Sequence, residues 1–353
     1  MYAGGIDLST IWLSDARPPC AYNAFVQMQV QNQPKQNGVA TRAFVGAAHL
    51  IVAVLICVLL PLAGMPLASA HGQVKSKSGP YRPAMTNGNT NLSFAHRAGL
   101  HQTPNPLGLS ASAAMAVDRH SGQVLYARNE RAILPIASLT KLMSAMVLLD
   151  AKLPMKARIR ITRDDVDQLR HSRSRLRVGT RMTRAEALRL ALMSSENRAA
   201  HALARTYPGG VPQFVRAMNR KAAELGMTGS TFYDPTGLTN RNRATAADVV
   251  ALASAATRYA TLRQYTTIRR HQVVFGHRPV KYLNSNRLVR YTQWPIKLQK
   301  TGYIVESGHC MVIVTRVEQR SVILVLLDSG SVNQAANDAR RLRAWVAEHG
   351  DSV

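Results

Sequence analysis

The order of strand-like and helix-like segments constrains the fold of this chain most. Residues 111–129 contain two short apolar runs around a polar turn, which predicts a β-hairpin. Two longer apolar runs, 309–317 and 320–328, predict two further strands near the end. The segments between them have helical spacing, and the alternation of a parallel βαβ fold is absent. We therefore expect an α+β fold whose antiparallel sheet joins the first and last parts of the domain.

Four segments carry helix signals. Apolar residues within 136–149 recur at helical spacing and predict a largely buried helix. Thr183 precedes another apolar pattern and is followed three residues later by Glu186, which indicates a capping box. Thr245 is a plausible N-cap after a loop rich in Pro, Gly and Asn, and residues 333–349 predict a final helix.

The first 70 residues have the features of an N-terminal extension followed by a secretory signal. An uninterrupted apolar run, Leu50 to Leu60, follows Arg42, and small residues suited to signal-peptidase cleavage occur at Leu67 to Ala70. Because Ala43 to Met65 carries no formal charge, an uncleaved membrane anchor is the alternative. Translation starting at Met28 would explain the long segment before Arg42.

The residues after this signal divide into two parts. Residues 71–108 are rich in Gly, Pro, Asn, Ser and Thr and lack periodicity, so we interpret them as a flexible linker. The folded domain is then expected over residues 109–353.

Charge and cysteine usage limit the possible partners. Lys and Arg number 45 against 19 Asp and Glu, a formal net charge of +26, which indicates an anionic partner or surroundings. No zinc-finger spacing or RNA-binding aromatic signature occurs, so we expect an anionic cell wall or membrane surface rather than nucleic acid. The cysteines, Cys20, Cys57 and Cys310, have no regular spacing, and the histidines form no H-E-x-x-H motif. We expect no metal or cofactor, and interpret Cys310 as a buried structural cysteine.

One serine and one lysine stand three residues apart in "IASLTKLMSAM", residues 136–146. On a helix Ser138 and Lys141 would share a face, with the N–H groups of the first turn close to the serine hydroxyl. Lys141 could take a proton only if burial or a second cation lowered its pKa far enough to make it neutral. The alternative is a capping serine beside a lysine whose charged end reaches solvent, and this pair alone favours that alternative.

Two further motifs change this interpretation. Ser195, Glu196 and Asn197 follow a capped helix, and Lys300, Thr301 and Gly302 stand shortly before the strand predicted over 309–317. The order Ser-x-x-Lys, Ser-x-Asn, Lys-Thr-Gly is the signature of penicillin-binding proteins and class A β-lactamases.

From about Ala111 to Asp328 the sequence resembles the serine D-Ala-D-Ala peptidases, the low-molecular-mass penicillin-binding proteins. The strings "RLRVG", "LALMSSENRAAHALA", "LGMTGSTFYDPTGL" and "LQKTGYI" look most like the D-Ala-D-Ala endopeptidase branch, the penicillin-binding protein 7 type. The resemblance implies a β-lactamase/transpeptidase-like α+β fold, with an antiparallel sheet of about five strands flanked by a helical subdomain. It also implies no C-terminal membrane anchor.

The resemblance assigns the reacting groups. Ser138 would be the acylated nucleophile and Lys141 its general base. Ser195 would relay a proton to the leaving amine, and Asn197 would hold the substrate amide. None of these steps requires a metal.

It also assigns the substrate-binding groups. Lys300 and Thr301 would bind a carboxylate of the substrate or of penicillin, and Lys300 would lower the pKa of the lysine in the first motif. Gly302 would let the substrate lie close to the strand edge. The backbone N–H groups of Ser138 and Tyr303 would form the oxyanion hole.

The implied activity is hydrolysis of D-alanyl peptide bonds of peptidoglycan in the periplasm through an acyl-enzyme, as an endopeptidase that cuts cross-links. A D-Ala-D-Ala carboxypeptidase, and a non-catalytic wall-binding protein of the same fold, are the alternatives. Efficient β-lactamase activity is not expected, because Glu186 is explained by capping and Glu196 lies inside the second motif. The expected partners are peptidoglycan peptides, β-lactams and the anionic wall surface.

Two sets of residues near these motifs have two interpretations each, and one serine has a single interpretation. Arg173, Arg175 and Arg177 alternate in a strand-like way and would either contact anionic peptides or form a solvated strand face. His309 would line the groove or lie in a turn, and Ser144 has no lysine three residues on and is assigned to packing.

Overall fold

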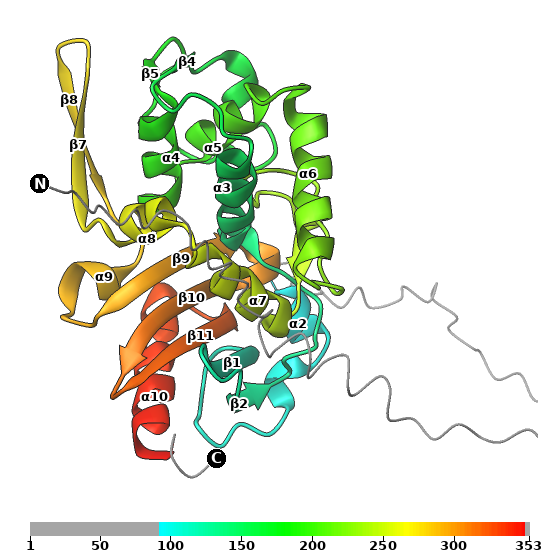
Figure 1. Cartoon of the computed structure of the whole chain (residues 1–353). Coiled ribbons are helices and arrows are strands. Elements are labelled where there is room, and N and C mark those ends of the chain that lie inside the picture. The colour runs from blue at the N-terminus through cyan, green and yellow to red at the C-terminus, as the bar shows by residue number, and fades with distance from the viewer. Residues whose placement is uncertain (1–91, 350–353) are drawn as a thin grey trace, which may run out of the picture. The chain divides into compact units, whose positions relative to one another are not determined.

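The protein was analysed as a computed structural model that describes residues 92–349, and its centre is a five-stranded antiparallel sheet (Figure 1). The strands lie in the order β2-β1-β11-β10-β9, all antiparallel. Their bounds are β1 Ala113–Asp118, β2 Val124–Arg128, β9 Ile296–Ile304, β10 Gly308–Val317 and β11 Arg320–Ser329. The α+β prediction is confirmed, as are the N-terminal hairpin and its pairing with the C-terminal strands.

Both faces of the sheet are covered by helices. Successive residues of β1 alternate between two apolar clusters, with Met115 in one and Ala116 in the other, as expected for side chains on opposite faces of a strand. Helix α10 (Val332–His349) covers one face, and α7 (Ala246–Ala256) covers the other. Burial on both faces explains why β10 and β11 have almost continuous apolar sequences.

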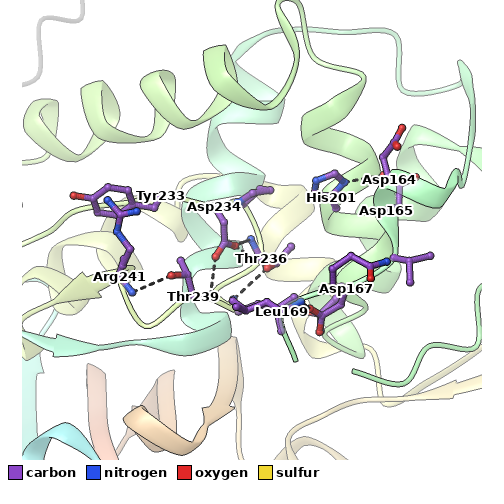
Figure 2. Close-up of a pocket in the computed structure, with 15 residues that line it drawn as sticks. Asp164, Asp165, Asp167, Leu169, His201, Tyr233, Asp234, Thr236, Thr239 and Arg241 are labelled. Carbon is purple, nitrogen blue, oxygen red and sulfur yellow. Dashed lines mark hydrogen bonds and ion pairs between the residues drawn. The ribbon is translucent and has the colours of Figure 1, made fainter. Parts of the chain in front are cut away.

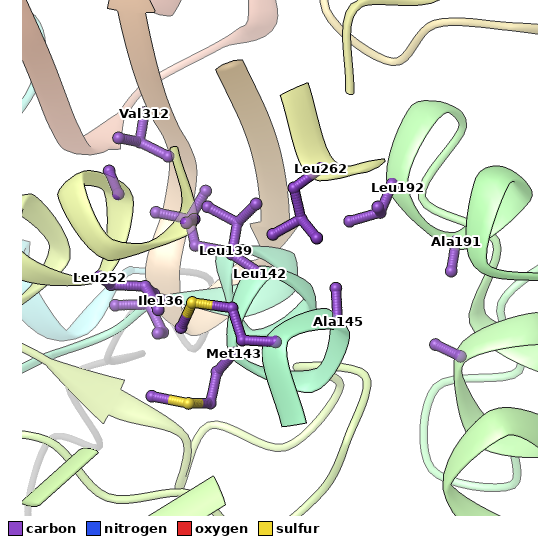
Figure 3. Packing of buried hydrophobic residues seen from close by; sticks show 14 of the residues in the cluster. Ile136, Leu139, Leu142, Met143, Ala145, Ala191, Leu192, Leu252, Leu262 and Val312 are labelled. Atoms are coloured by element: carbon purple, nitrogen blue, oxygen red, sulfur yellow. The ribbon is translucent and has the colours of Figure 1, made fainter. Parts of the chain in front are cut away.

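Helices α4, α5, α6 and α8 gather with α3 on one side of the sheet, whereas α9 lies beside β9 and its Leu288 packs in the cluster on the α10 face (Figure 1). Their bounds are α3 Thr140–Asp150, α4 Arg184–Met193, α5 Asn197–Arg205, α6 Gly210–Glu224, α8 Ala260–Thr267 and α9 Arg287–Tyr291. Leu142 and Met143 of α3 pack among residues from α4, α7, α8 and β10 (Figure 3). This packing confirms the buried helix predicted over 136–149, which starts with the 3₁₀ turn η2 (Ala137–Leu139).

Both predicted N-caps are present. The hydroxyl of Thr183 accepts the N–H of Glu186, and that of Thr245 accepts the N–H of Asp248. The reciprocal half of the predicted capping box is different, because the Glu186 carboxylate binds Arg189 and His271 instead of the cap backbone. Glu186 therefore joins α4 to a later strand.

The strand-like interpretation of residues 173–177 is wrong, because this segment is a loop. Local side-chain bonds take the place of a partner strand: the Ser174 hydroxyl accepts the N–H of Leu176, and Arg198 Nη1 donates to the Leu176 carbonyl. The only strand in this region is β5 (Arg181–Thr183), which pairs with β4 (Arg158–Arg160).

Several elements were not predicted. Strands β7 (Arg270–Phe275) and β8 (Arg278–Leu283) form a hairpin that projects from the body of the domain (Figure 1). Strand β9 itself was missed, because its Lys-Thr-Gly sequence interrupts the apolar pattern. Short elements complete the structure: α2 Phe94–Arg97, η1 Leu100–Gln102, β3 Leu134–Pro135, η3 Arg163–Asp165, β6 Arg243–Ala244 and η4 Val305–Ser307.

Residues 92–108 differ from the flexible linker expected there. They include α2 and η1, and the guanidinium of Arg128 donates to the carbonyls of Leu100, His101, Thr103 and Pro104. Polar bonds and a few isolated apolar contacts, such as the buried Ala95, hold this segment, so hydrophobic periodicity could not reveal it. The predicted extension, signal peptide or anchor, and start at Met28 lie outside the described residues. Within residues 92–349 no helix is both long and apolar enough to span a membrane.

Candidate active site

Ser138 lies in turn η2, directly before α3, and its backbone is enclosed by two glycines. A Cβ on Gly302 of strand β9 would lie 2.6 Å from the Ser138 nitrogen, and one on Gly237 would lie 2.8 Å from it. The preceding residue, Ala137, has a positive φ of 45°. A strained turn of this kind persists only where its surroundings hold it firmly, and here two glycine segments do so.

Lys141 lies one turn after Ser138 and is 1% exposed. Its Nζ donates to Ser138 Oγ at 2.8 Å, to Asn197 Oδ1 at 2.7 Å and to the Thr236 carbonyl at 2.7 Å. The last two partners can only accept from an amine. When Lys141 is neutral, two N–H bonds can serve these acceptors and the lone pair is left facing the Ser138 hydroxyl.

Burial lowers the pKa of Lys141 to about 7. The negative charges of Asp234, Glu196 and Asp167 act in the opposite direction and favour the ammonium form. The side chain is therefore poised between its two protonation states near neutral pH, which is the condition for a general base.

Lys300 and Ser195 form a second buried pair. Lys300 Nζ donates to Ser195 Oγ at 3.0 Å and to the Thr301 carbonyl at 2.6 Å, and the lysine is fully buried. Burial, and then the positive charge of Lys141, hold the pKa of Lys300 well below its usual value. From the sequence we expected Lys300 to lower the pKa of Lys141. In the structure burial is the main cause of the lowered pKa of Lys141, and the repulsion between the two lysines lowers the pKa of Lys300.

Asn197 and Thr301 are each held by a serine that was not singled out from the sequence. Asn197 begins α5, and its Nδ2 donates to Ser172 Oγ at 2.9 Å. The Thr301 and Ser285 hydroxyls lie 2.7 Å apart. These contacts fix the orientation of two groups predicted to bind substrate.

A cavity of about 270 Å³ opens in front of these groups. Its walls include Ser138, Ser195, Asn197, Thr301, Gly302, Tyr303 and His309. Tyr303 is 55% exposed and stacks on His309, with ring centroids 4.3 Å apart. His309 thus lines the groove from strand β10. Lys141 and Lys300 donate to Ser138 and Ser195, which line the cavity. All eight site residues predicted from the sequence therefore lie together.

A loop after α6 supplies the Thr236 carbonyl. The carboxylate of Asp234 accepts N–H groups of Thr236, Gly237 and Thr239, and the Thr236 hydroxyl, so one side chain organises the whole turn (Figure 2). The same loop borders a second, acidic cavity of about 410 Å³. Asp234 and Asp167 line this cavity and are two of the carboxylates that favour the charged form of Lys141.

Two other residues weighed from the sequence have structural positions. Cys310 is buried, and burial raises the pKa of its thiol to about 12, which makes it unreactive as predicted. Ser144 is buried and donates to the Pro235 carbonyl at 2.7 Å, so it joins α3 to the loop that carries Thr236. Among residues 92–349 no group of three or more His, Cys, Asp or Glu side chains is arranged to hold a metal ion.

Comparisons with known proteins show which proteins this chain is similar to. The D-alanyl-D-alanine endopeptidases of Pseudomonas aeruginosa and Escherichia coli are 43% and 39% identical to this chain over 240 residues, 67% of this chain and 77% of each relative. The crystal structure of the Streptomyces K15 DD-transpeptidase matches with a TM-score of 0.63 at 25% identity, covering 69% of this chain and 97% of that one. Penicillin-binding protein D2 from Listeria monocytogenes, in its ampicillin-bound form, matches with a TM-score of 0.59 at 27% identity, covering 69% and 98%.

The sequence model of one peptidase family covers most of the described domain. It matches residues 100–331, from η1 to the start of α10, and so includes all three motifs. The chain therefore belongs to the peptidase S11 family, the D-alanyl-D-alanine carboxypeptidases.

Proposed function

We propose that this protein is a serine peptidase that hydrolyses D-alanyl peptide bonds of peptidoglycan through an acyl-enzyme on Ser138. One observation carries the proposal: Ser138 Oγ lies 2.8 Å from the Nζ of Lys141, a buried lysine whose pKa is lowered to about 7. A serine hydroxyl is a weak nucleophile until a neighbouring base removes its proton, and a neutral Lys141 can do so.

In acylation, Lys141 takes the Ser138 proton while Oγ forms a bond to the D-alanyl carbonyl carbon. The N–H groups of Ser138 and Tyr303 stabilise the negative charge that develops on the carbonyl oxygen. Ser195 delivers a proton to the amide nitrogen as the C–N bond breaks, while Lys300 donates a hydrogen bond to Ser195 Oγ. The proton that Lys141 took from Ser138 then passes to the Ser195 oxygen, which restores the Ser195 hydroxyl and leaves Lys141 neutral for the next step. The amine leaves, and an ester remains on Ser138.

In deacylation, water attacks the ester carbonyl and gives one proton to the Lys141 amine. The C–O bond to Ser138 breaks, the serine oxygen recovers that proton, and the D-alanyl carboxylate is released. The same base thus serves both halves of the reaction, which requires its pKa to lie near the working pH.

The second lysine responds to the substrate. A carboxylate at Thr301 favours the protonated form of Lys300, and the resulting positive charge favours the neutral form of Lys141, since the two lysines repel each other. Substrate binding and activation of the base are therefore coupled in this proposal.

Endopeptidase action on cross-links is the preferred specificity, because the Pseudomonas and Escherichia relatives are named endopeptidases. Carboxypeptidase action is the second candidate, because the family description names that activity. Either substrate, and the β-lactams that mimic it, would be met outside the cytoplasm. A periplasmic location therefore belongs to the same proposal.

Digestion of purified cross-linked muropeptide dimers tests the proposal. Mass spectrometry of the products should show monomers if the enzyme is an endopeptidase, and dimers lacking one D-alanine if it is a carboxypeptidase. Unchanged dimers, together with retention of the protein on purified sacculi, would leave only a non-catalytic wall-binding protein.

A further inference from the structure

A loop beside the active site presents arginines that the proposed chemistry does not use. In residues 172–177 the side chains at even positions contact the domain, and those at odd positions are exposed. Ser172 accepts Asn197 Nδ2, and Ser174 Oγ donates to Glu196 at 2.7 Å. Leu176 is fully buried, whereas Arg173, Arg175 and Arg177 are exposed. The loop is thus anchored to the second motif by its inner residues and carries three guanidinium groups on its outer side.

Arg175 links this loop to the projecting β7–β8 hairpin. Its Nη1 donates to the Lys281 carbonyl, and its guanidinium lies over the Tyr282 ring, 5.7 Å from the centroid. Lys281 is itself exposed on β8. The hairpin, which projects from the body of the domain (Figure 1), therefore adds a positive charge beside that of Arg175.

The β4–β5 ribbon, which adjoins the loop, adds two arginines. Arg160 and Arg181 are cross-strand partners and both are exposed. Directly opposed like charges destabilise a strand pair. A Cβ on Gly179, in the loop before β5, would lie 3.8 Å from Arg160 Nη2, so the ribbon and the loop adjoin.

We define the basic rim as Arg160, Arg173, Arg175, Arg177, Arg181 and Lys281. In the described part of the chain, none of the six forms an ion pair with a carboxylate. Three neighbouring acids have partners within the domain: Glu196 is buried and bonded to Ser174, Glu186 is bonded to Arg189 and His271, and Asp167 accepts the N–H of Ser172. The rim is a positively charged surface whose own groups form no ion pair within the described residues, next to the acidic cavity that Asp164 and Asp167 line.

We propose that the basic rim binds carboxylates of the peptidoglycan strand outside the scissile bond, so that the enzyme engages the polymer rather than isolated fragments. The inference rests on the proposed function. A peptide network with repeated free carboxylates supplies the matching charge, and arginine binds a carboxylate through two parallel hydrogen bonds. The bond between Ser172 and Asn197 attaches this loop to a residue that lines the active-site cavity.

The test uses R173Q/R177Q, which removes two rim charges and leaves Arg175 in contact with the hairpin. The matched control is R216Q/R220Q, which removes two exposed arginines from α6. Binding to purified sacculi is measured by co-sedimentation at low and raised salt, and again with sacculi whose carboxylates have been amidated. Labelling by a fluorescent penicillin is followed in parallel.

We expect R173Q/R177Q to bind sacculi about fivefold more weakly than the wild type, with a smaller salt dependence, while the control stays within about twofold. Amidated sacculi should bind the wild type and R173Q/R177Q equally weakly, and penicillin labelling should be unchanged. If both double variants lost sacculus binding equally, the effect would come from the total charge of the protein and not from the rim, and the proposal would be overturned. Undiminished binding of the wild type to amidated sacculi would also overturn it. So would a loss of binding in R173Q/R177Q that is seen with a phosphate polymer such as polyphosphate and not with sacculi.

Failure of this inference can be distinguished from failure of the proposed function. Absence of a penicillin adduct on the wild type would contradict the catalytic proposal whatever the sacculus binding. A normal adduct with unaltered sacculus binding in R173Q/R177Q would contradict the rim alone.

Discussion

Gly302 of strand β9 contacts the backbone of Ser138 so closely that a methyl group on it would lie 2.6 Å from the serine nitrogen and 2.9 Å from the Ala137 Cβ. The glycine was expected to make room for the substrate along the strand edge. Its nearest neighbours are instead atoms of the turn that carries the proposed nucleophile. The Lys-Thr-Gly strand therefore sets the position of Ser138 as well as one wall of the cavity.

Substitution of Gly302 should damage acylation more than folding. In Gly302→Ala the turn at Ser138 has to shift, and we expect a loss of about 1–3 kcal/mol in the free energy of unfolding, typical of overpacking. Penicillin acylation should slow by at least about tenfold, since displaced reacting atoms lose rate steeply. Gly276→Ala is the control for acylation: nothing lies within 4 Å of a Cβ there, and its φ of 63° makes alanine costly to folding without touching the active site. Similar acylation rates in the two variants would disprove the positional role.

The rate of acylation should follow the protonation of Lys141. Its pKa is lowered to about 7, so the amine is mostly charged below that pH and mostly neutral above it. The rate constant for penicillin acylation, measured between pH 5 and 9, should rise through about 7 and then level off. A rate that stays constant across this range would mean that another group is the base.

Glu196 should tune this profile. Its carboxylate is 8% exposed and its negative charge favours the protonated form of Lys141. Glu196→Gln removes that charge and keeps an oxygen for the Arg198 N–H and the Ser174 hydroxyl. The midpoint of the acylation profile should move to lower pH. A midpoint that moved upward would contradict the electrostatic account.

The Arg170–Glu306 ion pair should contribute modestly to stability. Arg170 Nη2 donates to both carboxylate oxygens of Glu306, at 2.8 and 2.9 Å, and each side chain is about a quarter exposed. We expect Glu306→Gln to cost about 1 kcal/mol at pH 7, discounted for solvent screening. The control Glu130→Gln removes a carboxylate from a 3.7 Å pair whose arginine is 94% exposed, and should change little.

The pH dependence of this effect has a definite sign. Arg170 and Asn240 hold the pKa of Glu306 below its usual value, against burial, which raises it. A carboxyl with a lowered folded-state pKa stabilises the protein above its unfolded pKa and loses that contribution as the pH falls through the folded value. The difference in unfolding free energy between wild type and Glu306→Gln should therefore shrink on acidification. A difference that grew at low pH would be the contrary result.

The three motifs could be predicted from the sequence because their chemistry lies in side chains at fixed spacing. Ser138 and Lys141 share a helix face, and the order of the later motifs identified their partners before any geometry was known. The sheet was predictable for a similar reason: β10 and β11 are buried on both faces and have continuous apolar sequences.

Other features left no such signal. The Thr236 carbonyl binds Lys141, but a backbone oxygen has no sequence signature. Ser172 and Ser285 act through single tertiary contacts with Asn197 and Thr301, across 25 and 16 residues of chain. The arginines at 173–177 alternate with other residues as they would in a strand. The residues between them form local hydrogen bonds instead of pairing with a neighbouring strand.

The most direct test of the account is the site of penicillin attachment. The purified protein is incubated with a fluorescent penicillin, and peptides are analysed by mass spectrometry for the wild type and for Ser138→Ala, with circular dichroism as the check on folding. The account predicts one covalent adduct, on the peptide that contains Ser138, and none on the folded Ser138→Ala protein. An adduct of equal yield on Ser138→Ala, or none on the wild type, would contradict it.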